Sequence, residues 1–301
     1  MTNVTDISLL CAFKFLRTDQ VSIHFDGNYF SKNIKPFERP VCYFQKWQRA
    51  DTTLVQINST IPPDPLKIFN STGTVKTIAF TNVGTVSLGV SIYHCLVNFS
   101  GVVDGIYQLE ISGAVGLNTF QYYSEPISLK DFHPNTLLFR CFNYVNDFGV
   151  IFTVNYQIFF RCEAAIMEPD FKNERFAFTD EIHDVKTLSA VPYRDYKLQI
   201  GEAPGVAPWV IDTLNRVFSC AYVDIQGVEY AVIEGGKWSV NRQKAYAMIG
   251  AEIEITEGKN LQTNQINSGF TSPGIVTGYE IDTNFFGPTP QIVNVEKIEL
   301  I

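Results

Sequence analysis

Trp47-Gln-Arg-Ala-Asp-Thr-Thr-Leu-Val-Gln56 is the stretch of this chain that decides its fold. From Thr53 to Ile57 every second side chain points to one face of an extended strand, and the side chains between them point to the other face. A Trp and an Asp-Thr pair stand at the start of this strand. No nucleophile, metal-ligand cluster or phosphate-binding loop follows in the sequence. The pattern therefore indicates a β-rich, non-catalytic building block and names no reaction.

The bulk composition indicates a chain that folds and that offers surface to partners. Its 301 residues predict two domains of roughly 150 residues each. Hydrophobic residues make up 46% of the chain, which allows a sizeable core and argues against disorder. Charged residues make up 18%, below the roughly 25% of a typical solvated monomer. We therefore expect part of the surface to be covered by partners, and the 24 Phe and 14 Tyr residues suit such contacts.

The charge and hydropathy patterns argue against two classes of partner. Net charge is −8 and Lys and Arg form no cluster, so we expect no nucleic acid partner. No window reaches the roughly 18 apolar residues that span a bilayer, so we expect no membrane span. The apolar run from Ile7 to Phe15 is interrupted by Lys14 and makes a poor secretory signal. We expect a protein that is made, and first folds, in a cytoplasm.

The cysteines favour buried, reduced thiols. None of them is spaced as Cys-x-x-Cys, most lie within apolar runs, and a small disulfide scaffold would be shorter and denser in Cys. The six positions are Cys11, Cys42, Cys95, Cys141, Cys162 and Cys220.

Residues 1–127 are predicted to form an N-terminal β-sandwich domain. Short strands are separated by turn sequences such as Asp104-Gly105, and no helical stretch interrupts them. The alternation from Gly105 to Ile111 is the clearest. Pro126 lacks a backbone donor and favours a strand end or a sheet edge, which places the domain boundary close to it. The predicted strands are Ile7–Leu16, Val21–Phe25, Val41–Trp47, Thr53–Ile57, Thr74–Thr81, Ser87–Val97 and Ile106–Ser112.

Residues 128–262 are predicted to form a second β-rich domain with one helix near residues 208–220. Pro208 suits a first helical turn, and apolar side chains follow it at helical spacing. The predicted strands are Thr136–Tyr144, Val150–Phe160, Ala164–Met167, Phe176–Thr179, Asp184–Leu188, Tyr196–Ile200, Ala221–Ile225, Val228–Ile233, Lys237–Val240 and Ala251–Thr256. The expected fold class is therefore mainly β: two antiparallel β-sandwich-like domains, one short α-helix in the second, and a C-terminal extension.

Residues 263–301 are predicted to be a C-terminal arm or a terminal strand. Asn, Gln, Thr, Ser and Gly dominate the first part, and an apolar segment from Ile292 to Ile301 ends it. Such a segment can cross to a neighbouring subunit and add a strand to its sheet. The alternative is a strand that folds back on its own domain, which short loops favour.

The sequence predicts no catalytic residue, no metal ligand and no cofactor. The four His residues share no metal-binding spacing, and adjacent His94 and Cys95 in a strand would point to opposite faces. A glycoside hydrolase would need two carboxylates at a fixed separation. The sequence does not distinguish such a pair from solvated strand faces among the acidic groups Glu163, Glu168 and Asp170; Asp180, Glu181 and Asp184; and Glu252, Glu254 and Glu257.

Five aromatic residues are candidates for interface contacts or for stacking on a ligand. Trp side chains can form sugar-stacking platforms, but in a sandwich they more often lie in the core or in an interface. The five candidates are Trp47, Trp209, Trp238, Phe285 and Phe286.

Four local patterns resemble tail-associated virion proteins encoded by phages and prophages of Bacteroidota. Their order and spacing, over residues 41 to about 239, carry the resemblance. The patterns are Trp47-x-x-x-Asp51-Thr52-x-x-x-Gln56; Tyr123-Ser124-Glu125-Pro126-Ile127; Phe159-Phe160-Arg161; and Leu198-Gln199-Ile200-Gly201 followed by Gly205-Val206-Ala207-Pro208-Trp209 and a helix to Asn215.

The resemblance implies a two-domain structural protein of the tail tip, the baseplate or a neighbouring ring. Its expected partners are other virion proteins and copies of itself, its expected location is the virion, and it would be made in a bacterial host cytoplasm. No catalytic residue is implied. One alternative is a carbohydrate- or receptor-binding β-sandwich module, with exposed aromatics in a shallow groove and a host surface glycan as partner. Another is a hydrolase with a carboxylate pair in a deep acidic cleft.

Overall fold

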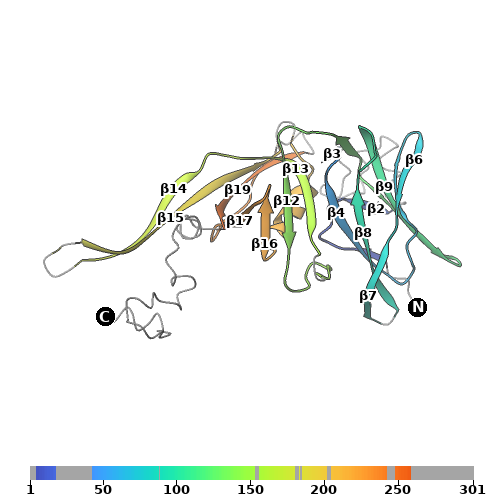
Figure 1. The fold of residues 1–301 in the computed structure, drawn as a ribbon, viewed down its shortest axis with the longest axis horizontal. Coiled ribbons are helices and arrows are strands. Elements are labelled where there is room, and N and C mark those ends of the chain that lie inside the picture. Colours follow the sequence, from blue (N-terminus) through green and yellow to red (C-terminus); the bar gives the residue numbers. More distant parts are fainter. Residues whose placement is uncertain are drawn as a thin grey trace, which may run out of the picture. The chain divides into compact units, whose positions relative to one another are not determined.

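The computed structural model describes most of the chain up to residue 258, and there the protein is mainly β with one short α-helix (Figure 1). The predicted fold class is confirmed in this respect. The predicted strand Val21–Phe25, Cys42, and the predicted arm 263–301 lie outside the described residues. The described residues are 5–17, 43–87, 89–152, 156–179, 183, 185–201, 205–242 and 248–258.

The strands of the N-terminal part form two sheets. One has the order β1-β4-β8-β7, and the other has the order β2-β10-β9-β11-β3, with β5 pairing to both β6 and β9. Every pairing is antiparallel except that of β11 with β3, which is parallel. The strands are β1 Thr5–Ile7, β2 Phe15–Arg17, β3 Gln45–Gln48, β4 Thr52–Ser59, β5 Leu66–Asn70, β6 Gly73–Ile78, β7 Thr81–Ser87, β8 Val90–Asn98, β9 Gly105–Val115, β10 Asn118–Ser124 and β11 Ile127–Lys130.

Alternating burial explains how these sheets pack in a sandwich-like arrangement. On β9 Tyr107, Leu109 and Ile111 are buried while Ile106 is exposed, as the period-2 pattern predicted. On β4 the predicted face of Thr53, Val55 and Ile57 is fully buried. Gln56, on the opposite face of β4, is buried as well. Its amide donates to the carbonyl of Gly149 at 3.1 Å, so a loop from the second half of the chain covers that face.

The second half of the compact part is one further sheet with the helix on it. From β15 onward the order is β15-β13-β12-β16-β17-β19-β18, with an additional pairing of β15 with β19. The elements are β12 Thr136–Phe142, β13 Ile158–Ile166, β14 Asp170–Thr179, β15 Val185–Ile200, α2 Pro208–Val217, β16 Tyr222–Ile225, β17 Val228–Val232, β18 Ser239–Arg242 and β19 Ile249–Glu257.

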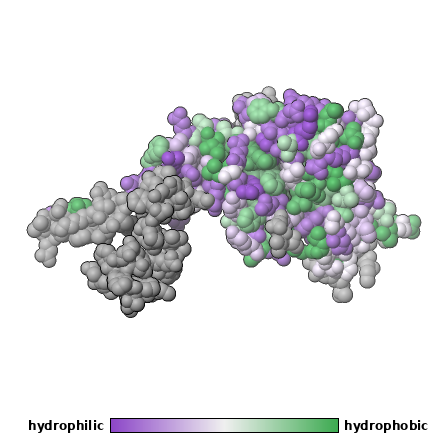
Figure 2. Space-filling model, viewed as in Figure 1, coloured by the Kyte–Doolittle hydropathy of each residue, from purple (hydrophilic) through white to green (hydrophobic). Residues whose placement is uncertain are grey.

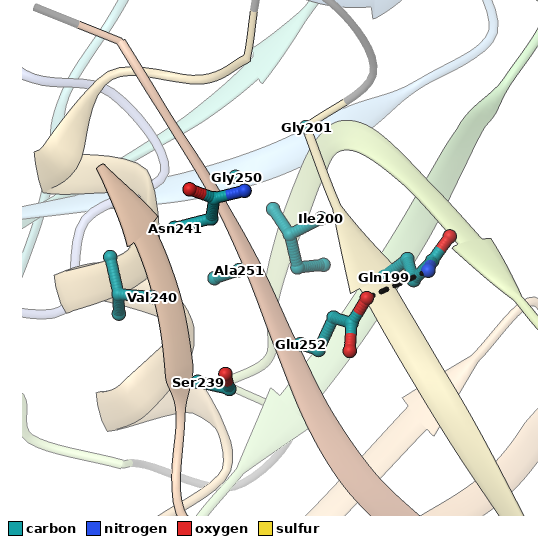
Figure 3. Close-up of a pocket in the computed structure, with 9 residues that line it drawn as sticks. All are labelled: Gln199, Ile200, Gly201, Ser239, Val240, Asn241, Gly250, Ala251 and Glu252. Carbon is teal, nitrogen blue, oxygen red and sulfur yellow. Dashed lines mark hydrogen bonds between the residues drawn. The ribbon is translucent and has the colours of Figure 1, made fainter. Parts of the chain in front are cut away.

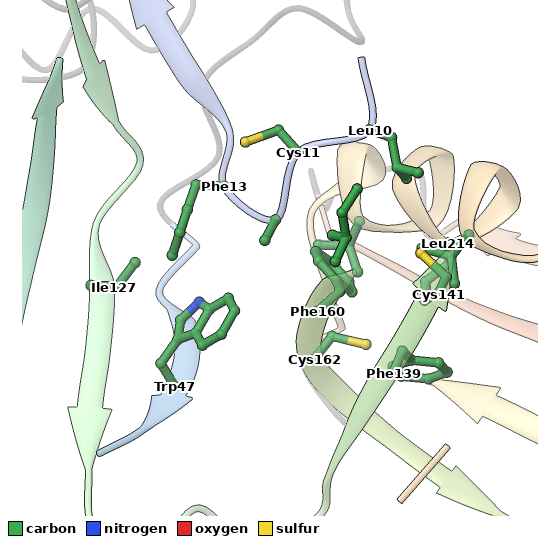
Figure 4. Packing of buried hydrophobic residues seen from close by; sticks show 14 of the residues in the cluster. Leu10, Cys11, Phe13, Trp47, Ile127, Phe139, Cys141, Phe160, Cys162 and Leu214 are labelled. Atoms are coloured by element: carbon green, nitrogen blue, oxygen red, sulfur yellow. The ribbon is translucent and has the colours of Figure 1, made fainter. Parts of the chain in front are cut away.

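Helix α2 begins as predicted, with Pro208 in its first turn, and ends at Val217 rather than at Cys220. The difference arises in the last turn, where the amides of Ser219 and Cys220 bond to carbonyls three residues back and tighten the chain out of the α-helix. The buried face of α2 is Val210, Ile211, Thr213, Leu214 and Val217. These side chains join one continuous core that also includes Trp47 and Phe160 (Figure 4).

Several strand predictions were wrong in position. The predicted strand Ile7–Leu16 is two short strands, β1 and β2, joined by a buried loop from Leu10 to Phe13 that inserts into the core. The predicted strand Val150–Phe160 begins only at Ile158. In the turn before it, Phe148 and Gly149 both have positive φ, at 52° and 70°. Strands β5, β10 and β11 had no predicted counterpart.

The chain divides into two compact units. The first combines the described residues up to Pro169 with Asp195–Gly258, and it contains all the strands above except β14 and the part of β15 before Asp195. The second contains Asp170–Arg194, where β14 and β15 form a two-stranded hairpin. The predicted boundary after residue 127 would fall at the start of β11, a strand of the N-terminal sheets, so the division into domains at that point stays a prediction.

Candidate functional site

Residues of the four sequence patterns meet inside the first unit, where β3 and β4 approach β13. We call this cluster the joint, and it is polar but buried. It joins the N-terminal sheets to the sheet that carries α2. Its members are Tyr43, Gln45, Asp51, Thr53, Glu125, Arg161, Glu163 and Trp209.

A buried ion pair lies at the centre of the joint. Arg161 donates from Nε to Asp51 Oδ2 at 2.6 Å and from Nη2 to Asp51 Oδ1 at 2.8 Å. The two side chains are only 7% and 4% exposed. Arg161 Nη1 also donates to Thr136 Oγ1 at 3.0 Å, and Asp51 Oδ2 accepts the amide of Gln48 at 2.7 Å. This geometry is bidentate and its remaining polar atoms are bonded, which is the condition under which a buried pair is tolerated.

Two side chains of the joint close the free edge of β13. β13 pairs with β15 only from Ala164 onward, so no strand of the described residues pairs with the preceding residues on that side. Thr53 Oγ1 accepts the amide of Phe159 at 3.2 Å and donates to the carbonyl of Phe159 at 2.7 Å. Gln45 Nε2 donates to the carbonyl of Arg161 at 3.3 Å. Backbone groups that a neighbouring strand would bond are therefore bonded by side chains.

Glu163 is a structural residue of the joint rather than a free carboxylate. The hydroxyl of Tyr43 donates to its Oε2 at 2.5 Å, and Lys46 Nζ lies 3.2 Å from its Oε1. Burial, followed by the charge of Glu163, raises the pKa of Tyr43 well above its ordinary value. Tyr43 therefore remains a hydrogen-bond donor at neutral pH.

Glu125 and Trp209 form the last contact of the joint. Trp209 Nε1 donates to Glu125 Oε2 at 2.7 Å. Burial raises the pKa of Glu125 to about 7, although the Trp209 hydrogen bond and the charge of Lys14 lower it. The Trp209 ring also meets Tyr43 and Phe160 edge to face, each at 6.1 Å. The first turn of α2 is thereby fixed to Glu125, which follows the end of β10.

The five aromatic candidates have different surroundings. The prediction that Trp47 contacts a partner or ligand is wrong, because its side chain is 0% exposed and packs against Phe13 at 4.9 Å. Trp209 is partly buried within the joint, and Trp238 is partly buried against Phe218 at 6.1 Å. The remaining two, Phe285 and Phe286, lie outside the described residues.

The candidates for chemistry show no assembled centre in the described part of the chain. No group of three or more His, Cys, Asp and Glu side chains lies close enough there to hold a metal ion. His94 bonds Gln56 at 2.9 Å and packs on the ring of Tyr156. Glu252 and Glu254 lie exposed on β19. Five cysteines are buried and unpaired as predicted: Cys11, Cys95, Cys141, Cys162 and Cys220.

No helix among the residues that the structure describes is long and apolar enough to cross a membrane.

Exposed apolar side chains lie at the ends of several strands, and the sequence periodicity did not single them out. Leu117 is 101% exposed at the turn of the β9–β10 hairpin, beside Val115 at 53%. Val103 and Phe132 are 70% and 69% exposed at the opposite end of β9. Arg49 holds their two loops together through ion pairs of 2.6 Å to Asp104 and 3.0 Å to Asp131. Hydrophobic residues are interspersed with hydrophilic ones on the visible face of the first unit (Figure 2).

A shallow polar hollow of about 570 Å³ lies over the ends of β15, β19 and β18 (Figure 3). Asn241 faces Gly250 across the β18–β19 pair, and Gly250 has no side chain to fill the space. Gln199 Nε2 donates to Glu252 Oε1 at 2.8 Å at one side of the hollow. Its lining offers amide, hydroxyl and carboxylate groups, and none of the nine lining residues is aromatic.

No protein-family model matches the chain, and no curated protein matches it.

Proposed function

We propose that this chain is a non-enzymatic structural component of a phage virion, in the tail tip, the baseplate or an adjacent ring. It would act through contacts with other virion proteins and with copies of itself. The observation that carries the proposal is the joint. Side chains that could otherwise perform chemistry, such as Asp51, Arg161 and Glu163, are used as internal links between two sheets.

The joint supports a mechanical role for a simple reason. A subunit of a tail has to transmit contacts from one face to another without deforming. Buried, bidentate and fully bonded contacts between the sheets resist such deformation better than apolar packing alone, because they fix direction as well as distance. The patterns on which the resemblance rests contribute Asp51, Glu125, Arg161 and Trp209 to this joint.

The exposed strand ends support contacts with neighbouring subunits. Leu117 and Val115 occupy one end of β9, and Val103 and Phe132 occupy the other. Two different apolar patches at opposite ends of one strand suit a head-to-tail interface, in which one surface meets a different surface of the next subunit. Such interfaces form a ring when the rotation from one subunit to the next closes on itself.

The test is genetic complementation in a phage that encodes the chain. A nonsense allele should give particles without complete tails, seen by negative-stain electron microscopy, and a plasmid copy should restore them. Leu117→Asp should fail to restore tails while keeping the wild-type melting temperature, because the side chain is exposed. Thr119→Asp is the matched control, since it adds the same charge at an exposed position two residues further on.

Two results would reject this role. The first is a nonsense allele that yields infectious phage with normal tails. The second is a nonsense allele that yields normal tails which fail to adsorb, and this result would favour the rival function.

The rival is a carbohydrate- or receptor-binding module, and the polar hollow offers it hydrogen-bond groups but not the exposed aromatic residues that such a module predicts. Gln199, Ser239, Asn241 and Glu252 offer hydrogen-bond groups of the kind that bind sugar hydroxyls. Binding of the purified chain to bacterial surface glycans, measured on an array, with loss on Asn241→Ala, would support the rival.

A further inference from the structure

The β14–β15 hairpin has edges that no strand of the described residues covers. β14 stands at the end of its sheet and pairs with β15 alone. β13 and β19 pair with β15 only between Asp195 and Ile200, beyond the hairpin. A two-stranded hairpin by itself is only marginally stable in water, and an open edge presents unpaired amide and carbonyl groups. The hairpin is therefore a place where a further strand can add.

The outer edge of β14 suits strand addition better than the outer edge of β15. Pro192 lies in β15 and has no amide hydrogen, and a proline in a sheet is accommodated where the ladder needs no donor. The open edge of β15 is therefore the one that Pro192 interrupts. β14, Asp170–Thr179, contains no proline. The consecutive side chains of Phe171, Lys172 and Asn173 are all exposed, so no described residue covers either face of β14 there.

The chain itself contains a segment that matches this edge. Residues Ile292–Ile301, which lie outside the described residues, are ten in number, and β14 has ten residues as well. Five of the ten are Ile or Val and none is Pro, a composition that favours a strand. The residues that directly follow Gly258 are rich in Asn and Gln, and Asn is depleted in strands. The apolar end of the chain is therefore the better candidate for the added strand.

The length of chain between β19 and this segment permits the contact. Thr256 pairs with Asp195, one residue from the hairpin. At the base of the hairpin the guanidinium of Arg194 lies 5.5 Å from the ring centre of Phe171. The 33 residues 259–291 have a root-mean-square span of about 30 Å as a flexible chain, and a ten-residue strand is about 33 Å long. A tether of this span holds its end near the edge at a millimolar effective concentration, which favours the same chain over a second copy.

We propose that residues Ile292–Ile301 add as a third strand to the open edge of β14 in the same chain. Main-chain hydrogen bonds supply the affinity of such an added strand, and alternate side chains supply its specificity. The inference does not depend on the proposed function. Its consequence is that the hairpin no longer offers the β14 edge to other chains, which protects the protein from edge-to-edge association.

The test is peptide-level hydrogen exchange on the full chain and on a chain that lacks residues 292–301. Peptides from Asp170–Thr179 should exchange about tenfold faster or more in the truncated chain, because the outward amides of β14 lose their acceptors. Peptides from Thr52–Ser59 should be unchanged and show that the first unit is folded. Val295→Pro should reproduce the deletion, since it removes a donor within the added strand. Asn264→Pro, in the tether, is the matched control and should leave exchange in β14 at the wild-type rate.

A crosslinking measurement on the full chain decides the matter even if the truncated chain does not fold. A photo-reactive amino acid at Val293 should link to peptides of Asp170–Thr179. In a mixture of isotope-labelled and unlabelled protein, both linked peptides should carry the same label. Equal exchange of β14 in the full and the folded truncated chains would overturn the inference, and so would links confined to other segments. Links between differently labelled chains would instead assign the edge to a second copy.

Discussion

Arg161 and Asp51 are 110 residues apart in sequence and form a two-pronged ion pair that is almost completely buried. The pair joins β13 to the residue just before β4, and therefore one set of sheets to the other. The contribution of this pair to stability depends on both partners being present, because the attraction between the two charges offsets the cost of removing each of them from water.

Replacing one partner of this pair should lower the free energy of unfolding much more than replacing both. Asp51→Ala should lower the free energy of unfolding by about 3–5 kcal/mol, because it leaves the Arg161 charge buried and unpaired. The double variant Asp51→Leu with Arg161→Met should recover a large part of that loss. Urea denaturation measures both. Asp131→Asn, in a mostly exposed ion pair with Arg49, is the control and should cost no more than about 1 kcal/mol. An additive double variant would contradict the interpretation.

Thr53→Val should open the edge of β13. The variant keeps the shape of the side chain but leaves the amide and carbonyl of Phe159 without the hydroxyl that bonds them, at a cost of about 1–3 kcal/mol. Hydrogen exchange at the Phe159 amide should accelerate. Thr52→Val, at the exposed neighbouring position, should change the free energy of unfolding by no more than about 0.5 kcal/mol and should leave hydrogen exchange at the Phe159 amide unchanged. Unchanged exchange at Phe159 in Thr53→Val would show that another group satisfies this edge.

Glu125 should make the fold more stable in mild acid than at pH 8. Its pKa is raised to about 7 in the folded protein from an ordinary value of 4.5, so the folded state binds the extra proton between these limits. The contribution of Glu125 to the free energy of unfolding is then greatest below pH 4.5, and it declines by on the order of 3 kcal/mol as the pH rises to about 7. Burial causes this rise in the pKa of Glu125, and the Trp209 hydrogen bond and the charge of Lys14 oppose it.

Glu125→Gln should remove this contribution, so that unfolding free energy varies less between pH 5 and pH 8 than in the wild type. Glu254→Gln, on the exposed face of β19, is the control and should keep the wild-type slope. An identical slope in Glu125→Gln and wild type would mean that Glu125 is charged in the folded protein throughout this range.

Leu214→Ala should destabilise the first unit by about 2–5 kcal/mol, because the side chain is 0% exposed and no neighbour can fully fill the cavity. Asn215→Ala changes the adjacent, exposed position and should stay within about 0.5 kcal/mol. The readout is a urea melt of each variant. A loss below about 0.5 kcal/mol in Leu214→Ala would mean that α2 is peripheral to the stability of the unit.

Deleting residues 263–301 tests the predicted C-terminal arm. If this segment serves assembly, the truncated chain should keep its melting temperature and fail to enter particles. A collapse of the melting temperature with aggregation of the monomer would instead assign the segment to its own core.

The sequence predicts elements well where a local pattern is sufficient. The alternation on β9, the start of α2 at Pro208 and the turn at Gln226-Gly227, where both residues have positive φ, all follow from residues close together in the chain. It predicts poorly where the partner is distant. The loop from Leu10 to Phe13 looks like a strand because it is apolar, yet it is apolar because the core of the first unit surrounds it.

The joint could not be predicted as a site for the same reason. Periodicity shows that Thr53 points inward but not that it meets Phe159, and it gives no reason to pair Glu125 with Trp209. The prediction that Trp47 contacts a partner or ligand was wrong for the same reason. An aromatic residue at the start of a strand can have the same local sequence whether it lies in the core or on a contact surface.

The parallel pairing of β3 with β11 sets an order on folding during synthesis. Residues Gln45–Gln48 leave the ribosome about eighty residues before their partners Ile127–Lys130, and Glu125 precedes Trp209 by a similar interval. The N-terminal sheet that contains β3 therefore cannot be completed before residue 130 is made, the Glu125–Trp209 contact cannot form before residue 209 is made, and loop closure over such distances is slow. A chain that ends before Trp209 therefore lacks the Glu125–Trp209 contact, and its N-terminal sheets are without that link to the helix.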